Sequence, residues 1–129
     1  DRLLIDGAHN PQGAQALAEY VQTFLKGRRI VLLVGMMKDK DVAACTRLYA
    51  QIAREAVCTQ VDYPRAMPAA ELAGLCRAQG MDALAEPSVP HALEIARERA
   101  GSDGLIIVCG SLYLVGDVRV RLHDDDGQL

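Results

Sequence analysis

Long hydrophobic runs are absent from this sequence of 129 residues, although half of its residues are hydrophobic. The longest apolar stretches, residues 30–34 and 105–109, contain only a handful of residues, whereas a helix needs about 20 to cross a bilayer. Neither end shows the charged, apolar and small-residue pattern of a secretion signal. We therefore expect no membrane partner and a cytoplasmic location.

An excess of charge of one sign is also lacking. The 14 Lys and Arg residues are balanced by 17 Asp and Glu residues, which gives a net charge of -3. Charges of mixed sign without a basic stripe provide no electrostatic footprint for a phosphate backbone. We therefore expect no nucleic-acid partner.

Closely spaced metal ligands are missing too, because the sequence has no C-x-x-C pair. The four cysteines are widely separated, whereas thiolate zinc sites need ligands in close pairs. Each cysteine lies within an apolar pattern, which is typical of reduced, buried core residues. The cysteines are Cys45, Cys58, Cys76 and Cys109. We expect no metal site in this chain.

Known catalytic and nucleotide motifs are absent as well. The sequence has no G-x-x-x-x-G-K-[ST] phosphate loop, no G-x-G-x-x-G motif and no G-x-S-x-G nucleophile elbow. The chain therefore contains no known nucleotide cradle of its own. We assign no catalytic residue within it.

What the sequence does contain is an alternation of short apolar runs with segments of helical period. This alternation predicts an α/β protein whose parallel strands are buried by crossover helices. The expected strands cover residues 3–6, 30–34, 56–61, 81–85 and 105–109. We expect one domain over residues 1–122 and a disordered polar tail over residues 123–129. Since the chain starts with Asp1 and not with Met, we also expect a fragment of a longer enzyme.

Polar residues gather in three loops, 6–11, 35–41 and 110–113, each of which follows a strand and opens a helix. In an open parallel sheet, ligands bind outside the carboxyl ends of the strands. The N-terminus of a helix also favours phosphate or carboxylate groups. The three loops are therefore the candidate ligand site.

Each loop also has a simpler interpretation. Asp6 and Asn10 can satisfy backbone amides, and Ser111 can cap a helix. The second loop can be a solvated charged segment, in which Asp41 caps the helix that follows. His91 and His123 are interpreted as surface residues without function.

The three loops together resemble the folylpolyglutamate synthase/dihydrofolate synthase family. The resemblance rests on D-G-A-H-N-P at residues 6–11, on V-G-M at 34–36 followed by D-K-D at 39–41, and on C-G-S-L-Y-L-V-G at 109–116. It extends over nearly the whole chain and is specific to the C-terminal domain of this Mur-ligase-type enzyme. It implies a Rossmann-like, three-layer α/β/α sandwich with a mostly parallel five-stranded sheet in the order 1-5-2-3-4.

The resemblance also implies an activity. The family uses ATP and Mg²⁺ to convert a carboxylate of folate or dihydropteroate into an acyl phosphate, which the amino group of L-glutamate attacks. The phosphate loop and the magnesium ligands belong to the preceding central domain, so the fragment alone should be inactive. Its implied role is to close as a lid over that domain and to help bind ATP and the incoming glutamate.

Individual site residues are likewise implied by the resemblance. Those expected to contact ATP are Asp6, His9 and Asn10. Those expected to contact glutamate are His9, Lys40, Ser111 and Tyr113. One sequence leaves open whether Lys38 or Lys40 is the functional lysine, and whether the enzyme acts on folates only or also on dihydropteroate.

Two other functions stay open at this point. The chain could be the C-terminal domain of a peptidoglycan Mur ligase, or a non-catalytic α/β module that senses a small anion. The resemblance further implies an antiparallel strand before residue 3, and this chain starts too late to include it. An open first strand invites pairing with another chain, so we expect a dimer of the fragment through that edge.

Overall fold

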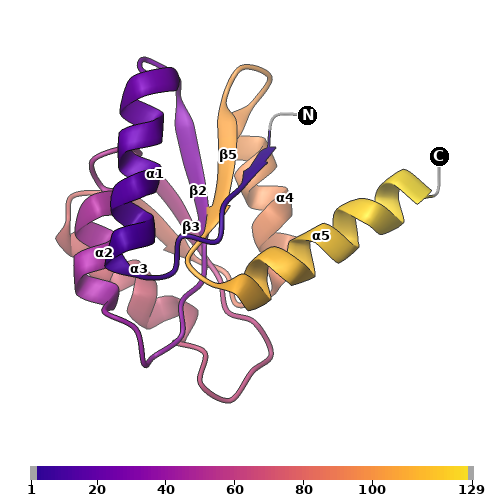
Figure 1. Ribbon diagram of the computed structural model, residues 1–129. Helices are drawn as coiled ribbons and strands as arrows, with labels where there is room; N and C mark the ends of the chain where they lie inside the picture. Colours follow the sequence, from indigo (N-terminus) through magenta and orange to yellow (C-terminus); the bar gives the residue numbers. More distant parts are fainter. Residues whose placement is uncertain (1–2, 128–129) are drawn as a thin grey trace.

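The computed structural model describes residues 3–127, in which five strands alternate with five helices (Figure 1). The strands are β1 (Leu3–Ile5), β2 (Ile30–Val34), β3 (Glu55–Cys58), β4 (Asp82–Ala85) and β5 (Leu105–Cys109). The helices are α1 (Pro11–Phe24), α2 (Val42–Tyr49), α3 (Ala69–Ala78), α4 (Val89–Ala100) and α5 (Leu112–Gly127). The α/β class expected from the alternating pattern is confirmed.

The strands form one sheet in the order β1-β5-β2-β3-β4, and every ladder in it is parallel. This is the order that the resemblance implied. Helices α1, α2 and α3 contribute to the hydrophobic cluster on one face, and α4 and α5 contribute to the cluster on the other. The molecule is therefore a three-layer sandwich, with β1 and β4 at the edges of the sheet.

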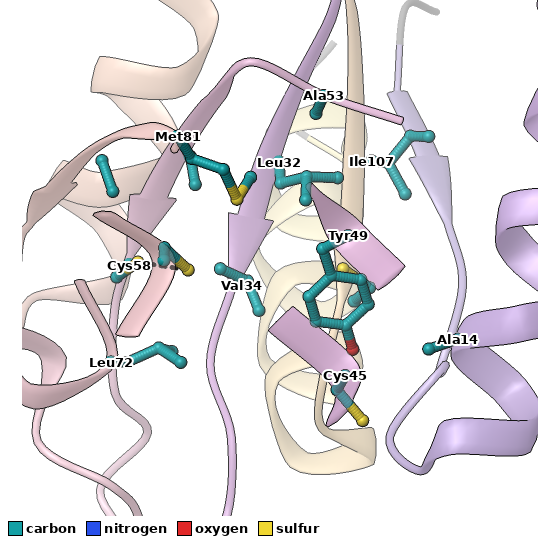
Figure 2. Packing of buried hydrophobic residues seen from close by; sticks show 14 of the residues in the cluster. Ala14, Leu32, Val34, Cys45, Tyr49, Ala53, Cys58, Leu72, Met81 and Ile107 are labelled. Atoms are coloured by element: carbon teal, nitrogen blue, oxygen red, sulfur yellow. Dashed lines mark hydrogen bonds between the residues drawn. The ribbon is translucent and has the colours of Figure 1, made fainter. Parts of the chain in front are cut away.

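The two central strands are buried along their whole length, which explains their continuous apolar sequences. Successive side chains of β2 point to opposite faces, so Leu32 joins one cluster and Leu33 the other. Figure 2 shows part of the first cluster, where Leu32 and Val34 of β2 lie near Ile107 of β5.

Three helices begin at a residue whose side chain caps the first turn. The Asn10 side chain accepts a hydrogen bond from the backbone N–H of Gly13 at 2.7 Å, and Pro11 occupies the first turn of α1. Asp41 accepts from Ala44 in the same way at the start of α2. Ser88 caps α4. Each cap satisfies a backbone donor that the helix itself leaves unpaired.

The third strand is shorter than expected, because it ends at Cys58 and not at residue 61. Cys58 pairs with Ala85, the last residue of β4, and the Cys58 carbonyl accepts a final bond from Glu86. Pro87 follows, and a proline has no N–H with which to extend a ladder. The chain therefore leaves the sheet and forms the loop of residues 59–68.

The structure also differs from the expected tail over residues 123–129. Helix α5 extends to Gly127, so residues 123–127 belong to the helix. No proline or glycine interrupts the chain between Gly116 and Gly127, and each helical residue added to an existing helix contributes a further hydrogen bond. Residues 128–129 lie outside the described part of the chain.

All four cysteines are free and buried, which confirms their interpretation as core residues. Burial raises the pKa of the Cys45 thiol to about 11, and the nearby Asp41 carboxylate adds to this effect. The sulfur atoms of Cys58 and Cys76 lie 3.8 Å apart, with the Cys58 thiol donating (Figure 2). Within residues 3–127, no helix is both long and apolar enough to cross a membrane.

Candidate functional site

The three polar loops meet at the carboxyl edge of the sheet. Because β5 lies between β1 and β2, the loops that leave these strands are neighbours. They are also bonded directly to one another. The Gly110 N–H donates to the Ala8 carbonyl at 3.0 Å, and the Gly35 N–H donates to the Cys109 carbonyl at 3.3 Å. The fold thus unites the loops that the sequence analysis selected.

Gly110 lets the loops approach this closely. Its φ of +102° lies in the region that favours glycine. A Cβ atom there would be 2.4 Å from the Gly35 carbonyl oxygen and 2.9 Å from the Met36 sulfur. Only a residue without a side chain fits at position 110, where the first, second and third site loops come into contact.

A pocket of about 210 Å³ lies where the loops meet. Its lining residues are His9, Met37, Asp39, Lys40, Arg65, Gly110, Ser111, Leu112 and Tyr113. All four residues assigned to glutamate from the sequence are in this set. Asp6 and Asn10, assigned to ATP, are not, and neither is Lys38.

His9 is held by its own loop. Its Nδ1 atom lies 2.7 Å from the carbonyl oxygen of Gly7. A carbonyl can only accept, so Nδ1 carries the proton of this bond and Nε2 of the neutral ring is an acceptor. In this state Nε2 of His9 can accept a hydrogen bond from an ammonium group of a ligand.

Asp6 and Asn10 shape the loop around His9. One carboxylate oxygen of Asp6 accepts from the backbone N–H of Ala8 at 2.9 Å, and Asn10 caps α1 as described above. The simpler interpretation, that both side chains satisfy backbone amides, is therefore confirmed. A carboxylate has a second oxygen, so the Asp6 bond is compatible with a further ligand contact.

Ser111 caps the last helix. Its side chain is buried, with 2% exposed, and its oxygen accepts from the backbone N–H groups of Tyr113 at 3.1 Å and Leu114 at 3.4 Å. The serine-cap interpretation is confirmed. Since both bonds use lone pairs, the hydroxyl proton can still be donated to a ligand in the pocket.

The sequence analysis missed a fourth loop, residues 59–68, which brings Tyr63 and Arg65 to the site. The rings of Tyr63 and Tyr113 are stacked with their centroids 4.3 Å apart, and their hydroxyl oxygens lie 3.2 Å apart. The hydrogen bond from Tyr113 lowers the pKa of Tyr63, and Arg65 lowers it further. This aromatic pair joins the fourth loop to α5.

Arg65 extends the connection to the second loop. Its guanidinium carbon lies 5.9 Å from the centre of the Tyr63 ring, within the range of a cation–π contact. Its Nη1 atom lies 3.1 Å from a carboxylate oxygen of Asp39. The sequence analysis did not select this fourth loop. The overlooked signal was its position, since it follows a strand at the same edge of the sheet as the other loops.

Residues interpreted as lying at the surface do so. His91 and His123 are exposed, and Lys38 is exposed beside the pocket.

No group of three His, Cys, Asp or Glu side chains in the described part of the chain is placed to hold a metal ion. A larger hollow of about 590 Å³ lies at the opposite edge of the sheet, between residues 27–30 and 50–55. None of the predicted site residues lines it.

The sequence of this chain matches a known protein family. Residues 2–112 match the sequence family described as Mur ligase, glutamate ligase domain. The dihydrofolate synthase/folylpolyglutamate synthase of Bacillus subtilis is 28% identical over 118 residues, a match that covers 92% of this chain and 27% of the relative. The chain thus spans little more than a quarter of the length of this relative.

Solved structures agree with the sequence match. FolC of Escherichia coli, in complex with DHPP and ADP, superimposes with a TM-score of 0.88 at 25% identity, covering 96% of this chain and 29% of that one. A bifunctional folylpolyglutamate synthase/dihydrofolate synthase with Mn, AMPPNP and L-glutamate bound gives a TM-score of 0.81 at 29% identity. That match covers 94% of this chain and 29% of that one.

Proposed function

Because this chain belongs to the Mur ligase glutamate ligase domain family, we propose that it is the C-terminal domain of a cytoplasmic ATP-dependent ligase that adds L-glutamate to folates. The observation that carries the proposal is the single pocket that contains His9, Lys40, Ser111 and Tyr113. These four residues come from three separate loops. A pocket assembled from loops at the carboxyl edge of a parallel sheet is the usual place for a ligand.

The charges of the pocket suit glutamate. Lys40 and Arg65 supply two cations for the two carboxylates of the amino acid, and Asp39 supplies an acceptor for its ammonium group. In the structure Asp39 and Arg65 bond to each other. An incoming carboxylate would share Arg65 with Asp39, and the Ser111 hydroxyl can donate to the same carboxylate.

The proposed reaction needs both a good leaving group and a positioned amine. ATP transfers its terminal phosphoryl group to a folate carboxylate and leaves as ADP. The glutamate amine then attacks the acyl carbon, phosphate leaves, and the amine loses a proton. Holding the amine next to the acyl carbon accelerates such a step by making it effectively intramolecular. In our proposal this chain supplies that positioning.

We assign ATP contacts to Asp6, His9 and Asn10, which form the turn at the N-terminus of α1. This turn can face a phosphate or a ribose because a helix N-terminus favours anions. The residues described offer no carboxylate cluster for Mg²⁺. In our proposal the ion and most phosphate contacts therefore belong to the rest of the parent protein. The chain would then act as a lid and be inactive alone.

The test is glutamate incorporation by the full-length parent protein. Radiolabelled L-glutamate and ATP are supplied with either tetrahydrofolate or dihydropteroate, and the 129-residue chain alone serves as the control. We expect incorporation by the parent and none by the chain. Incorporation with both acceptors would identify a bifunctional enzyme. A folded, ATP-competent parent that incorporates glutamate with neither acceptor would contradict the proposal and favour a peptidoglycan ligase or an anion sensor.

A further inference from the structure

A buried hydroxyl donates a hydrogen bond to the first site loop and has no role in the proposed chemistry. It belongs to Tyr49 in the last turn of α2, whose side chain is 0% exposed. The ring lies in the apolar layer near Cys45 and Val34 (Figure 2). Its oxygen lies 2.5 Å from the carbonyl oxygen of Ala8, in the first site loop, and 3.8 Å from the sulfur of Met36, in the second.

The acceptor of this bond is a specific peptide group. The Ala8 carbonyl belongs to the peptide that joins Ala8 to His9, and it receives a second bond from the N–H of Gly110. One donor thus comes from α2 and the other from the loop that follows β5. Two donors from different elements restrain the orientation of this peptide, and His9 begins at its nitrogen.

We propose that Tyr49 is a positioning residue, whose hydroxyl fixes the Ala8–His9 peptide and so holds the His9 imidazole in the pocket. The proposal deepens the proposed function, on which its kinetic consequence rests. It assigns Tyr49 no contact with substrate or nucleotide.

The surroundings of Tyr49 suit this role. Burial strongly raises the pKa of its hydroxyl, so the group stays protonated and donates throughout the pH range in which a ligase would work. The Ala8 backbone is itself buried beside Tyr49. Without the hydroxyl, the Ala8 carbonyl would keep the bond from the Gly110 N–H but lose the bond from α2. The Ala8–His9 peptide could then rotate more freely.

A matched control separates positioning from general stability. Thr46 is also on α2 and also 0% exposed, but its hydroxyl donates to the Ala43 carbonyl at 3.0 Å within the same helix. Thr46→Val and Tyr49→Phe each remove one buried hydroxyl and keep most of the side-chain volume. Only Tyr49→Phe removes a bond to a site loop.

The kinetic test uses both variants in the full-length parent protein. We expect Tyr49→Phe to lower kcat/KM for glutamate incorporation about tenfold, mainly by raising KM, and Thr46→Val to stay within about twofold of the unsubstituted enzyme. Melting temperatures should fall in both. Equal losses of kcat/KM in the two variants, or an unchanged Tyr49→Phe enzyme, would overturn the proposal.

A second readout does not require enzymatic activity. Nitrogen NMR of histidine-labelled full-length protein reports which ring nitrogen of His9 carries the proton. We expect the Nδ1-protonated form in the unsubstituted protein and in Thr46→Val, and a mixture of tautomers in Tyr49→Phe. If the parent fails to incorporate glutamate but this shift occurs, the proposed function fails and the positioning role stands. An unchanged tautomer in Tyr49→Phe would reject the positioning role.

Discussion

The imidazole of His9 forms a hydrogen bond through Nδ1 to the carbonyl oxygen of Gly7, only two residues earlier in the chain, at 2.7 Å. A ring restrained by its own loop presents one defined nitrogen, Nε2, for interaction with a ligand. The restraint requires the chain to turn sharply over residues 6–10. The bonds of Asp6 to Ala8 and of Asn10 to Gly13 stabilise that turn.

Replacing His9 tests the proposed contact with substrate. In the full-length parent, His9→Ala should raise the Michaelis constant for ATP or glutamate about tenfold or more, because a hydrogen bond to a charged ligand is lost. His91→Ala, which alters an exposed histidine on α4, is the control and should leave both constants unchanged. Steady-state kinetics measure the effect, and unchanged constants for His9→Ala would refute the assigned role.

A pair of lysine variants tests which lysine of the second loop is functional. Lys40 lines the pocket, whereas Lys38 is exposed outside its lining. Lys40→Ala should raise KM for glutamate about tenfold, since a cation facing a carboxylate is removed, and Lys38→Ala should have little effect. The opposite order of effects in the same assay would assign the role to Lys38.

Gly110→Ala tests the close approach of the loops. Its Cβ would meet the Gly35 carbonyl at 2.4 Å with φ at +102°, so we expect a loss of about 3 kcal/mol in the free energy of unfolding. Gly74→Ala on α3 is the control, because its Cβ would meet nothing within 4 Å, and it should stabilise the protein by about 0.5–1 kcal/mol. Urea unfolding measures both. A harmless Gly110→Ala would show that the loops can separate at no cost.

The buried thiols predict a fall in stability at alkaline pH. The Cys45 pKa is raised from 9.0 to about 11, so above pH 9 the unfolded chain loses a proton that the folded chain retains. The contribution of the buried thiol to the free energy of unfolding is fully present below pH 9 and is lost as pH rises through about 11. For one thiol, the free energy of unfolding falls by up to about 1.4 kcal/mol per pH unit in this range.

Urea unfolding between pH 7.5 and 11 measures this dependence, with Cys45→Ala as the comparison. The variant should be less stable at pH 7.5 but lose stability with a smaller slope above pH 9. Burial also raises the pKa of Cys109, so part of the slope should persist. Identical slopes for the two proteins would show that Cys45 does not contribute.

The position of β1 at the edge of the described sheet predicts self-association of the chain. β1 pairs with β5 on one side and lies at the edge of the described sheet. Unpaired N–H and C=O groups at such an edge favour addition of another strand. We propose a dimer through β1, to be measured by light scattering over a concentration series. A monomer at the highest concentration would count against it.

Local features of the sequence predicted much of the fold. The apolar run of residues 30–34 encodes a strand that is buried on both faces, and Asn10, Asp41 and Ser88 encode three helix starts. Each signal acts over a few residues, through the period of side-chain burial or through one hydrogen bond to a nearby backbone group. The order of the strands came from the resemblance of three motifs to a family, because periodicity carries no information about which strands are neighbours.

Tertiary structure decided how distant segments meet. The stacking of Tyr63 on Tyr113 and the bond from Tyr49 to Ala8 join residues that are 50 and 41 positions apart. No local pattern encodes such pairs, because they exist only once the sheet order has brought the strand ends together. By itself, the sequence determined the elements, their caps and the loops rich in polar residues. The parallel packing of β1, β5, β2 and β3 decided that four loops, and not three, surround one pocket.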